Sequence, residues 1–293
     1  MKVLLIGATG TIGSIIAKLL YNTSIDLRLT SSRQDSIAAI KDEYRDAEVV
    51  VADLLSVSSL SAAVEGVDRI MLISPDLIGE KLVCSNIKQA IEMAGGVERI
   101  VKLLTFPPGL SIDDIDVKDR KFELGYNQGL TAKAELDKTD LPVVYANITS
   151  AFMSNILWCA TQIINYGKFV MPCPQTATWI HPKDVALACS TLLLRDDNAD
   201  IGSAFEISGG AMLSFNDIAT VLSDVLKVDI EHDDSNAMLD EMFGEDRGLF
   251  VGFFESERRY YDGLEPSTTF KELTGESPKS LTQWAEESKA ELI

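Results

Sequence analysis

The chain has 293 residues, of which 46% are hydrophobic and 24% are charged, a balance typical of folded globular proteins and not of collagen, coiled coils or disordered chains. Aspartate and glutamate outnumber lysine and arginine by 45 to 26. The resulting formal charge of −19 disfavours binding to duplex nucleic acid or to an anionic membrane surface.

Short apolar runs alternate with amphipathic stretches along the first half of the chain, which is the pattern of β-α-β units with a parallel sheet. The predicted strands cover residues 2–6, 27–30, 49–52, 69–73, 99–104 and 143–147. Apolar residues recur at helical spacing over 12–20 and again over 82–94, where two glycines end the pattern. We therefore predict a doubly wound α/β fold.

The pattern changes from about Phe152. A helix rich in Trp and Ile, a proline-rich segment at 171–174, a helix after Pro182 and a strand at 204–207 follow in that order. Ser214 and Asp217 have the spacing of a capping box, which predicts the start of a further helix. We expect this second half to be a mixed α/β region.

The four cysteines and two histidines form no metal-binding or disulfide pattern. Cys84, Cys159, Cys173 and Cys189 are widely spaced without a CxxC pair, so we expect buried thiols in a reducing compartment. Two histidines are too few for a zinc motif, and no apolar stretch approaches 18 residues. We expect a cytoplasmic protein without a metal centre.

A glycine-rich motif follows the first predicted strand and opens the first predicted helix. Its three glycines fit the pattern GxxGxxG. The first permits a tight turn, the second lets a pyrophosphate approach the backbone, and the third lets helix and strand pack closely. Free N–H groups at the helix start favour an anion. The residues predicted to bind a dinucleotide here are Gly7, Thr9, Gly10, Thr11, Ile12 and Gly13.

This motif assigns a role to each half of the chain. We expect residues 1–150 to form a Rossmann-type dinucleotide-binding domain. Residues 151–293 then form a smaller mixed α/β lobe that binds the substrate and can be interleaved with the first. Since no low-complexity linker separates the two, we expect one compact body with a cleft between the lobes.

The end of the second predicted strand indicates which dinucleotide binds. NAD sites usually carry Asp or Glu there, whereas this chain has Ser32 and Arg33. Because Arg33 can pair with a 2′-phosphate and Ser32 can donate a hydrogen bond to it, NADP is the predicted cofactor. The alternative is that Arg33 is a solvated surface charge. Asp53 and Leu54 follow the third strand, where they would lie beside the adenine ring, although Asp53 could equally cap a turn.

Several short motifs along the chain share the pattern of one enzyme family. They are GATGTIG at 7–13, Arg33, ADLL at 52–55, IMLISP at 70–75, KLLT at 102–105, FMSN at 152–155, DVA at 184–186 and FEISGGAMLSFN at 205–216. Together they resemble the NmrA-like family of atypical short-chain dehydrogenases/reductases over nearly the whole chain. The segment 273–287 is similar to fungal members that act on alkaloids and other natural products. The resemblance implies an NADP(H)-dependent reductase in which Ser74 and Pro75 contact the cofactor.

Standard short-chain dehydrogenases use a Tyr-x-x-x-Lys dyad to transfer a proton as hydride moves, and no tyrosine of this chain has that spacing. The resemblance implies Lys133, seven residues after Tyr126, as the nearest substitute, the alternative being a solvated helix lysine. Thr105 takes the place of the catalytic serine, where it could hold a substrate carbonyl or cap a turn. The predicted catalytic residues are therefore Lys133, Thr105 and Tyr126, and the first two are also expected to contact the cofactor.

Aromatic and apolar residues near the predicted cleft indicate a hydrophobic substrate. The residues predicted to contact it are Phe106, Phe152, Met153, Trp179 and His181. The alternative is that these side chains belong to the core, as most aromatic residues do. Family members often carry Arg after the sixth strand, where this chain has the stretch Ala146–Thr149 without an arginine, so the resemblance leaves the polar substrate contacts undefined.

Three functions fit these observations. The first is hydride transfer from NADPH to a C=N, C=C or C=O bond of a hydrophobic small molecule, such as an alkaloid or other secondary metabolite. An iminium acceptor suits a site without the usual proton donor, because it is already cationic. The second is a cyclase or isomerase that uses the bound nicotinamide for internal redox chemistry. The third is a non-catalytic NADP-sensing regulator. The oligomeric state, monomer or homodimer, stays open.

Overall fold

The computed structural model describes residues 1–122 and 124–292, and the chain divides into two compact units. The first unit contains Met1–Ile148 and Val185–Glu206. The second contains Thr149–Asp184 and the described residues from Ile207 onward. The first unit is thus made of two separate stretches of sequence.

The first unit is built on β-α-β repeats. Its strands are β1 (Lys2–Ile6), β2 (Asp26–Ser31), β3 (Glu48–Val51), β4 (Arg69–Leu72), β5 (Arg99–Leu104), β6 (Val143–Ile148) and β10 (Ala204–Ile207). Its α-helices are α1 (Thr11–Tyr21), α2 (Ile37–Glu43), α3 (Val57–Val64), α4 (Glu80–Ala94), α5 (Gly125–Leu136) and α7 (Pro182–Leu194). The first three residues of α7 belong to the second unit. Short 3₁₀ helices cover Gln34–Ser36, Ile112–Asp114 and Asn198–Asp200.

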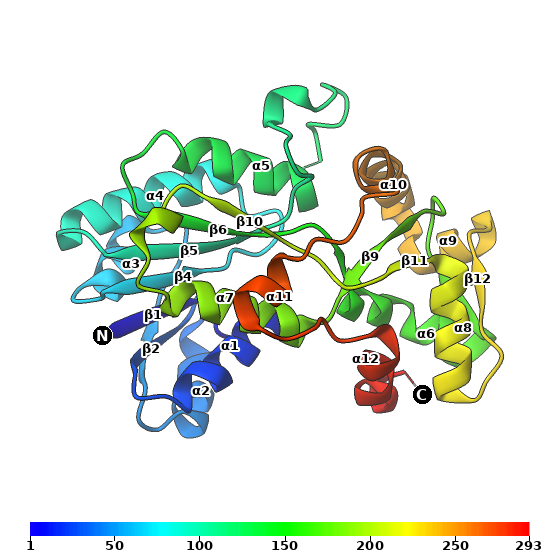
Figure 1. Ribbon diagram of the computed structural model, residues 1–293, viewed down its shortest axis with the longest axis horizontal. Helices are drawn as coiled ribbons and strands as arrows, with labels where there is room; N and C mark the ends of the chain where they lie inside the picture. Colours follow the sequence, from blue (N-terminus) through cyan, green and yellow to red (C-terminus); the bar gives the residue numbers. More distant parts are fainter. Residues whose placement is uncertain (123, 293) are drawn as a thin grey trace. The chain divides into compact units, whose positions relative to one another are not determined.

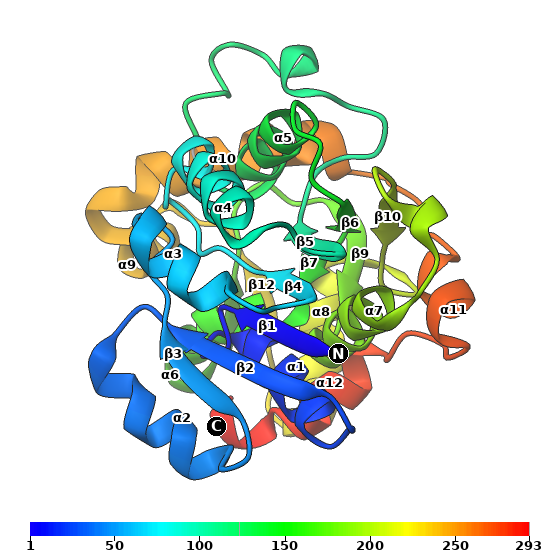
Figure 2. The same cartoon turned by 90° about the vertical axis from the view of Figure 1, so that its left-hand side faces the viewer.

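The seven strands form one sheet in the order β10-β6-β5-β4-β1-β2-β3. Neighbouring strands run parallel, and Val3 at the centre pairs with Leu27 of β2 on one side and with Arg69 of β4 on the other. Helices α3, α4 and α5 cover one face, while α1 and α7 cover the other (Figures 1 and 2). Both faces of the central strands are therefore buried, which explains why these strands are continuous apolar runs in the sequence.

The observed elements confirm the predicted α/β class and the doubly wound sheet. Predicted strands differ from β1 to β6 by at most one residue at either end, and the strand predicted at 99–104 matches β5. One placement was wrong: we assigned residues 204–207 to the second lobe, but β10 is the outer strand of the central sheet, beside β6. Tyr145 of β6 donates a backbone hydrogen bond to the carbonyl of Ser203, just before β10.

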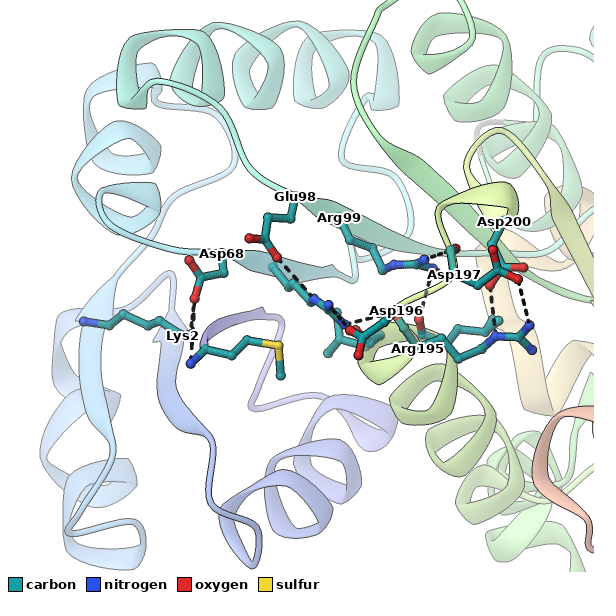
Figure 3. A network of polar contacts seen from close by, with 12 residues as sticks. Lys2, Asp68, Glu98, Arg99, Arg195, Asp196, Asp197 and Asp200 are labelled. Carbon is teal, nitrogen blue, oxygen red and sulfur yellow. Dashed lines mark hydrogen bonds and ion pairs between the residues drawn. The ribbon is translucent and has the colours of Figure 1, made fainter.

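Two buried arginines explain why α7 and β10 belong to the first unit. Arg69 donates to the carbonyl oxygens of Leu193 (3.0 Å) and Arg195 (2.9 Å), at the end of α7. Arg99 donates to the carbonyl oxygens of Leu192 (3.3 Å) and Asp197. Figure 3 shows Arg99 beside Asp197, together with the ion pairs that Arg99 and Arg195 form with Asp200. Because the last carbonyls of a helix lack partners within it, the guanidinium groups fasten α7 to the start of β4 and β5.

The second unit has small sheets and short helices. Its strands are β7 (Ala151–Phe152), β8 (Lys168–Val170), β9 (Thr176–Ile180), β11 (Met212–Ser214) and β12 (Glu231–Asp233). Its α-helices are α6 (Ala160–Tyr166), α8 (Phe215–Leu226), α9 (Asn236–Phe243), α10 (Arg247–Tyr261), α11 (Thr269–Thr274) and α12 (Leu281–Glu287). Met153–Cys159, Gly244–Asp246 and Lys289–Glu291 are 3₁₀ helices. One sheet has the order β11-β9-β7, and β12 pairs with β8.

Aromatic rings fill the core of the second unit. The Phe215 ring lies edge-on to Phe169 and Trp179, with ring centroids 5.9 and 6.5 Å away. The predicted capping box is confirmed, since the Asp217 carboxylate accepts from Ser214 N at 2.8 Å and Asp217 N donates back to the Ser214 hydroxyl at 3.1 Å. The Trp- and Ile-rich segment predicted as one helix is instead a 3₁₀ helix followed by the short α6.

The cysteines are free thiols. Cys84, Cys159 and Cys189 are buried, and burial raises the pKa of each to about 12, whereas Cys173 is half-buried. Within the described part of the chain, no group of His, Cys, Asp and Glu is placed to hold a metal ion. None of the described helices is both long and apolar enough to cross a bilayer.

Candidate functional site

The turn between β1 and α1 depends on glycine at two positions. Gly7 has φ +91°, and a Cβ added there would lie 2.9 Å from the carbonyl oxygen of Ile73. A Cβ added at Gly13 would lie 1.9 Å from the carbonyl oxygen of Gly7, which no rotamer change could relieve. The first and third glycines therefore let the turn, the helix and the neighbouring strand approach one another closely.

The start of α1 is suited to an anion. Gly10 is the N-cap residue, no described side chain caps this helix, and its first turn contains no acidic residue. Its first backbone N–H groups thus lack intrahelical partners, and the helix dipole adds partial positive charge at the same place. A pyrophosphate fits this end of the helix better than a carboxylate-bearing side chain would.

A groove of about 390 Å³ opens beside the turn. The residues predicted to bind the dinucleotide that line it are Gly7, Thr9, Gly10, Ser32, Asp53, Leu54, Ser74 and Pro75. The sequence did not indicate the other lining residues, which are Ile6, Thr30, Ser31, Ala52, Ile73 and Ile78. The ends of β1, β2, β3 and β4 therefore meet at one concave edge of the sheet, which is where ligands bind in doubly wound folds.

The predicted 2′-phosphate contact lies at the rim of this groove. Arg33 follows the groove residue Ser32, and its side chain is 76% exposed. Its guanidinium donates to the Ser36 hydroxyl at 3.1 Å and lies 3.7 Å from a carboxylate oxygen of Asp35. Such exposed contacts are weak, so the side chain can exchange them for a phosphate. Asp53 lines the groove and also accepts from Leu55 N at 2.9 Å, so the turn-capping alternative holds for this residue too.

A polar cluster with two buried charges adjoins the groove at Ser74, and it is hard to recognise from the sequence. Lys102 of β5 is fully inaccessible, and its ammonium lies 2.9 Å from the carboxylate of Glu80, whose side chain is 2% exposed. Both groups hydrogen bond to the hydroxyl of Ser74, a groove residue. A lysine inside an apolar strand was the one available signal, because buried lysines require a partner.

Thr105 and Phe106 follow β5 and are held by β6. The Thr105 hydroxyl donates to the carbonyl of Ile148 at 2.8 Å. The Asn147 amide accepts from Phe106 N at 2.9 Å and donates to Phe106 O at 3.0 Å. Phe106 itself is 4% exposed. Asn147, in the stretch where the resembled family often has Arg, thus fixes the chain after β5.

The remaining predicted catalytic residues lie elsewhere in the first unit. Tyr126 is fully buried. Lys133 forms an ion pair with Asp137 at 2.6 Å and lies 4.9 Å from the centre of the Tyr145 ring. Neither residue lines the groove beside the glycine turn, and neither does Thr105. The structure therefore does not bring these three residues together with the glycine motif.

The predicted substrate residues of the second unit are mostly core side chains. Met153, Trp179 and His181 are 2–3% exposed, while Phe152 is half-buried. His181 accepts from Lys183 N at 3.0 Å and lies 3.3 Å from Glu287. Burial lowers the pKa of His181, although the nearby Glu287 carboxylate acts in the opposite direction. The neutral ring thus acts as a local acceptor at the start of α7.

Residues 7–146 match the model of a protein family described as NAD(P)H-binding. The match begins at the first glycine of the turn and ends in β6, so it includes every residue that lines the groove except Ile6. These residues form an NAD(P)H-binding domain. The predicted nicotinamide dinucleotide is thereby confirmed.

Curated and solved proteins resemble the chain beyond this domain. An NAD(P)H azoreductase of Xenophilus azovorans is 26% identical over 223 residues, which cover 75% of this chain and 72% of the relative. A structure described as a nucleoside-diphosphate-sugar epimerase of Staphylococcus aureus has TM-score 0.80 at 18% identity, covering 98% of this chain and all of the other. The triphenylmethane reductase of Citrobacter sp., complexed with NADP(H), has TM-score 0.78 at 14% identity, covering 96% and 98%.

These likenesses agree on the fold and differ in the named activities. A mutant NmrA protein also shares the fold, with TM-score 0.71 at 14% identity and coverage of 98% and 94%. At such identities the structures establish a common fold only. The azoreductase, which is the more similar in sequence, is a reductase that uses the same kind of cofactor.

Proposed function

We propose that the protein is an NADPH-dependent reductase of the NmrA-like, atypical short-chain type. It transfers hydride to a C=N, C=C or C=O bond of a hydrophobic small molecule. The groove beside the glycine turn carries this proposal, because its lining and the uncapped helix start suit a dinucleotide. The likeness to an azoreductase supports reduction as the reaction.

The choice of NADPH over NADH rests on the end of β2. The predicted contacts there are Ser32 and Arg33, and neither Asp nor Glu occurs among the last residues of the strand or directly after it. A guanidinium can bind the 2′-phosphate through two hydrogen bonds, whereas a 2′-hydroxyl group needs a carboxylate acceptor. Arg33 is exposed enough to do this without breaking a buried contact.

The bound NADPH would supply the hydride, and the protein would bind and orient the two reactants. Thr105 is our proposed contact for the reacting end, because its hydroxyl follows β5 on the far side of β4 from the glycine turn. Its hydroxyl donates to the carbonyl of Ile148, which fixes its position after β5.

Two of the predicted catalytic residues have other partners in the structure. Lys133 is paired with Asp137, and Tyr126 is fully buried. An acceptor that needs no proton from the enzyme before hydride transfer fits such a site. We therefore propose cationic or strongly polarised acceptors, and the formal charge of −19 favours cationic molecules near the protein.

The test measures NADPH oxidation in the presence of a panel of cyclic iminium ions, azo dyes, quinones and enones. The absorbance of NADPH monitors the reaction. We expect turnover with at least one cationic or quinoid acceptor and slower turnover with NADH. An alkaloid-type iminium ion in the panel tests the natural-product role. Tight NADPH binding without turnover of any acceptor would contradict the reductase proposal.

The second candidate is a regulator that binds NADP(H) without turnover, and the shared fold with NmrA is the observation that favours it. A sensor of redox state must distinguish the oxidised from the reduced cofactor or respond to their total. Titration of the protein with NADP⁺ and NADPH, combined with the panel above, separates the two functions.

A further inference from the structure

The ion pair of Glu80 and Lys102 is buried in the protein, where an ion pair adds little to the free energy of unfolding. Removing an ammonium and a carboxylate from water costs several kcal/mol each, so such pairs often contribute little net stability. Yet the Lys102 side chain is 0% exposed and that of Glu80 is 2% exposed. These two groups therefore matter for what they hold in place.

They hold the hydroxyl of Ser74, the second residue after β4. The Lys102 ammonium has only protons to give, so the Ser74 oxygen accepts from it. The Glu80 carboxylate only accepts, so the Ser74 proton is directed to it. With its proton and one lone pair engaged, the hydroxyl retains one lone pair. Ser74 lines the groove, so this lone pair is available to a ligand that donates a hydrogen bond.

Gln128 of α5 fixes the loop that follows Ser74. Its amide nitrogen donates to Pro75 O at 2.8 Å and lies 3.3 Å from the Glu80 carboxylate. Its amide oxygen accepts from Leu77 N at 3.0 Å. Leu77 has φ +61°, a conformation that a leucine rarely adopts unless its surroundings impose it. The loop is thus held in one shape before any ligand binds.

The strand order tells which part of a dinucleotide Ser74 would meet. The glycine turn follows β1, and β2 and β3, with Ser32 and Asp53 at their ends, lie on one side of it. β4 and β5 lie on the other side. If the pyrophosphate lies at the turn and the adenosine over β2 and β3, the other half of the molecule extends over β4. Ser74 then faces the sugar of that half, whose hydroxyls are hydrogen-bond donors.

We propose that Glu80, Lys102 and Gln128 are positioning residues that hold Ser74 as a hydrogen-bond acceptor for a hydroxyl of the nicotinamide ribose. This inference rests on the proposed function, because it needs NADPH in the groove. It assigns to the buried ion pair a role in cofactor affinity.

The test compares two ligands, NADPH and 2′,5′-ADP, which lacks the nicotinamide half. Dissociation constants are measured for both by calorimetry, on wild type, Ser74→Ala, Gln128→Ala and the double variant Glu80→Gln with Lys102→Met. The double variant removes both charges together, so that neither is left buried without a partner. We expect each variant to bind NADPH about tenfold more weakly, the effect of one lost hydrogen bond, and 2′,5′-ADP within about twofold of wild type.

A cycle with Ser74→Ala separates positioning from general loosening of the domain. If the ion pair acts through Ser74, adding Ser74→Ala to the double variant should weaken NADPH binding no further. The matched control is Arg99→Met with Asp200→Asn, which removes a buried ion pair from the opposite end of β5. This control should bind both ligands as the wild type does, whatever its stability.

Three outcomes would overturn the inference. NADPH affinity of Ser74→Ala within about twofold of wild type would show that its hydroxyl makes no contact. Equal weakening of NADPH and 2′,5′-ADP would show that the variants distort the whole groove. If the wild type binds neither ligand, the proposed function fails, and the inference fails with it. Ser74→Ala changes a partly exposed hydroxyl only, so it keeps the test valid even if the double variant does not fold.

Discussion

Arg99 and Lys102 stand three residues apart in β5, and both are at most 1% exposed, yet they contact different layers of the domain. Arg99 donates to carbonyl oxygens at and after the end of α7. Lys102 bonds to side chains at the start of α4 and in the loop before it. α4 and α7 cover opposite faces of the sheet (Figure 2), as expected for strand residues an odd number apart.

The partners of the two cations reveal the difference in role. At the Arg99 end the acceptors include main-chain oxygens of α7, and the Asp196 carboxylate that pairs with Arg69 is 90% exposed (Figure 3). At the Lys102 end the acceptors are side chains, namely the buried Glu80 and the half-buried Ser74, which lines the groove. A cation that satisfies helix carbonyls stabilises the fold, whereas one that orients a groove hydroxyl also prepares a site.

The largest expected effect is on stability, at the Arg99 end. Arg99→Met removes the donor to Leu192 O and Asp197 O and one of the two arginines that pair with the buried Asp200 carboxylate. We expect the free energy of unfolding to fall by about 3–5 kcal/mol, measured by urea denaturation. The NADPH dissociation constant of the folded protein should not change. Lys138→Met removes an exposed ion pair with Glu135 and is the control, with an expected loss below about 1 kcal/mol. A comparable loss in both variants would break the comparison.

The next effect extends the comparison to Asp184 in the second unit, a buried carboxylate that forms no ion pair with any of the described residues. Its carboxylate accepts from Lys279 N at 2.7 Å, and burial raises its pKa from 3.8 to about 6. Between these values the folded state binds more protons than the unfolded state, so stability should fall as the pH rises from about 4 to about 7. The full effect is about 3 kcal/mol.

Asp184→Asn keeps the acceptor for Lys279 N and removes the titration. Denaturation midpoints between pH 4 and pH 8 should then decline less steeply than in the wild type, and the variant should be the more stable protein at pH 7. Burial also raises the pKa of Glu257 to about 7, so part of the decline should persist at higher pH until Glu257→Gln is added. An identical pH profile for wild type and Asp184→Asn would count against this account.

A third prediction concerns Arg33, which follows the groove residue Ser32. Arg33→Asp replaces the proposed partner of the 2′-phosphate with a carboxylate, which repels a phosphate and accepts from a 2′-hydroxyl group. We expect the preference for NADPH over NADH to fall by about 10- to 100-fold, measured as the ratio of the two dissociation constants. Ser74→Ala should weaken both dinucleotides alike. If Arg33→Asp leaves the ratio unchanged, the 2′-phosphate lies elsewhere.

The smallest effect is expected at Lys133. Its ion pair with Asp137 is partly exposed, so Lys133→Met should lower the free energy of unfolding by less than about 1 kcal/mol. NADPH affinity should stay within about twofold, because Lys133 does not line the groove. Turnover with the best acceptor then decides its predicted catalytic role, and a loss of tenfold or more would support that role.

The sequence by itself predicted the features that depend on local pattern. The parallel strands are apolar runs because both of their faces are buried, and the glycine motif is recognisable because its first and third glycines answer steric demands within one turn. Groove residues such as Ser32 and Leu54 followed from the same rule, since each comes two residues after a predicted strand.

Only the tertiary structure decided the roles that depend on distant partners. Lys102 meets Glu80 across 22 positions of sequence, and Arg99 meets Asp197 across 98. The placement of β10 beside β6 likewise joins two strands that are far apart in the sequence. A buried charge is tolerated only where its partners converge, and no spacing along the chain records that convergence. Composition thus gave the net charge, and the fold determined which few charges are buried and what each one holds.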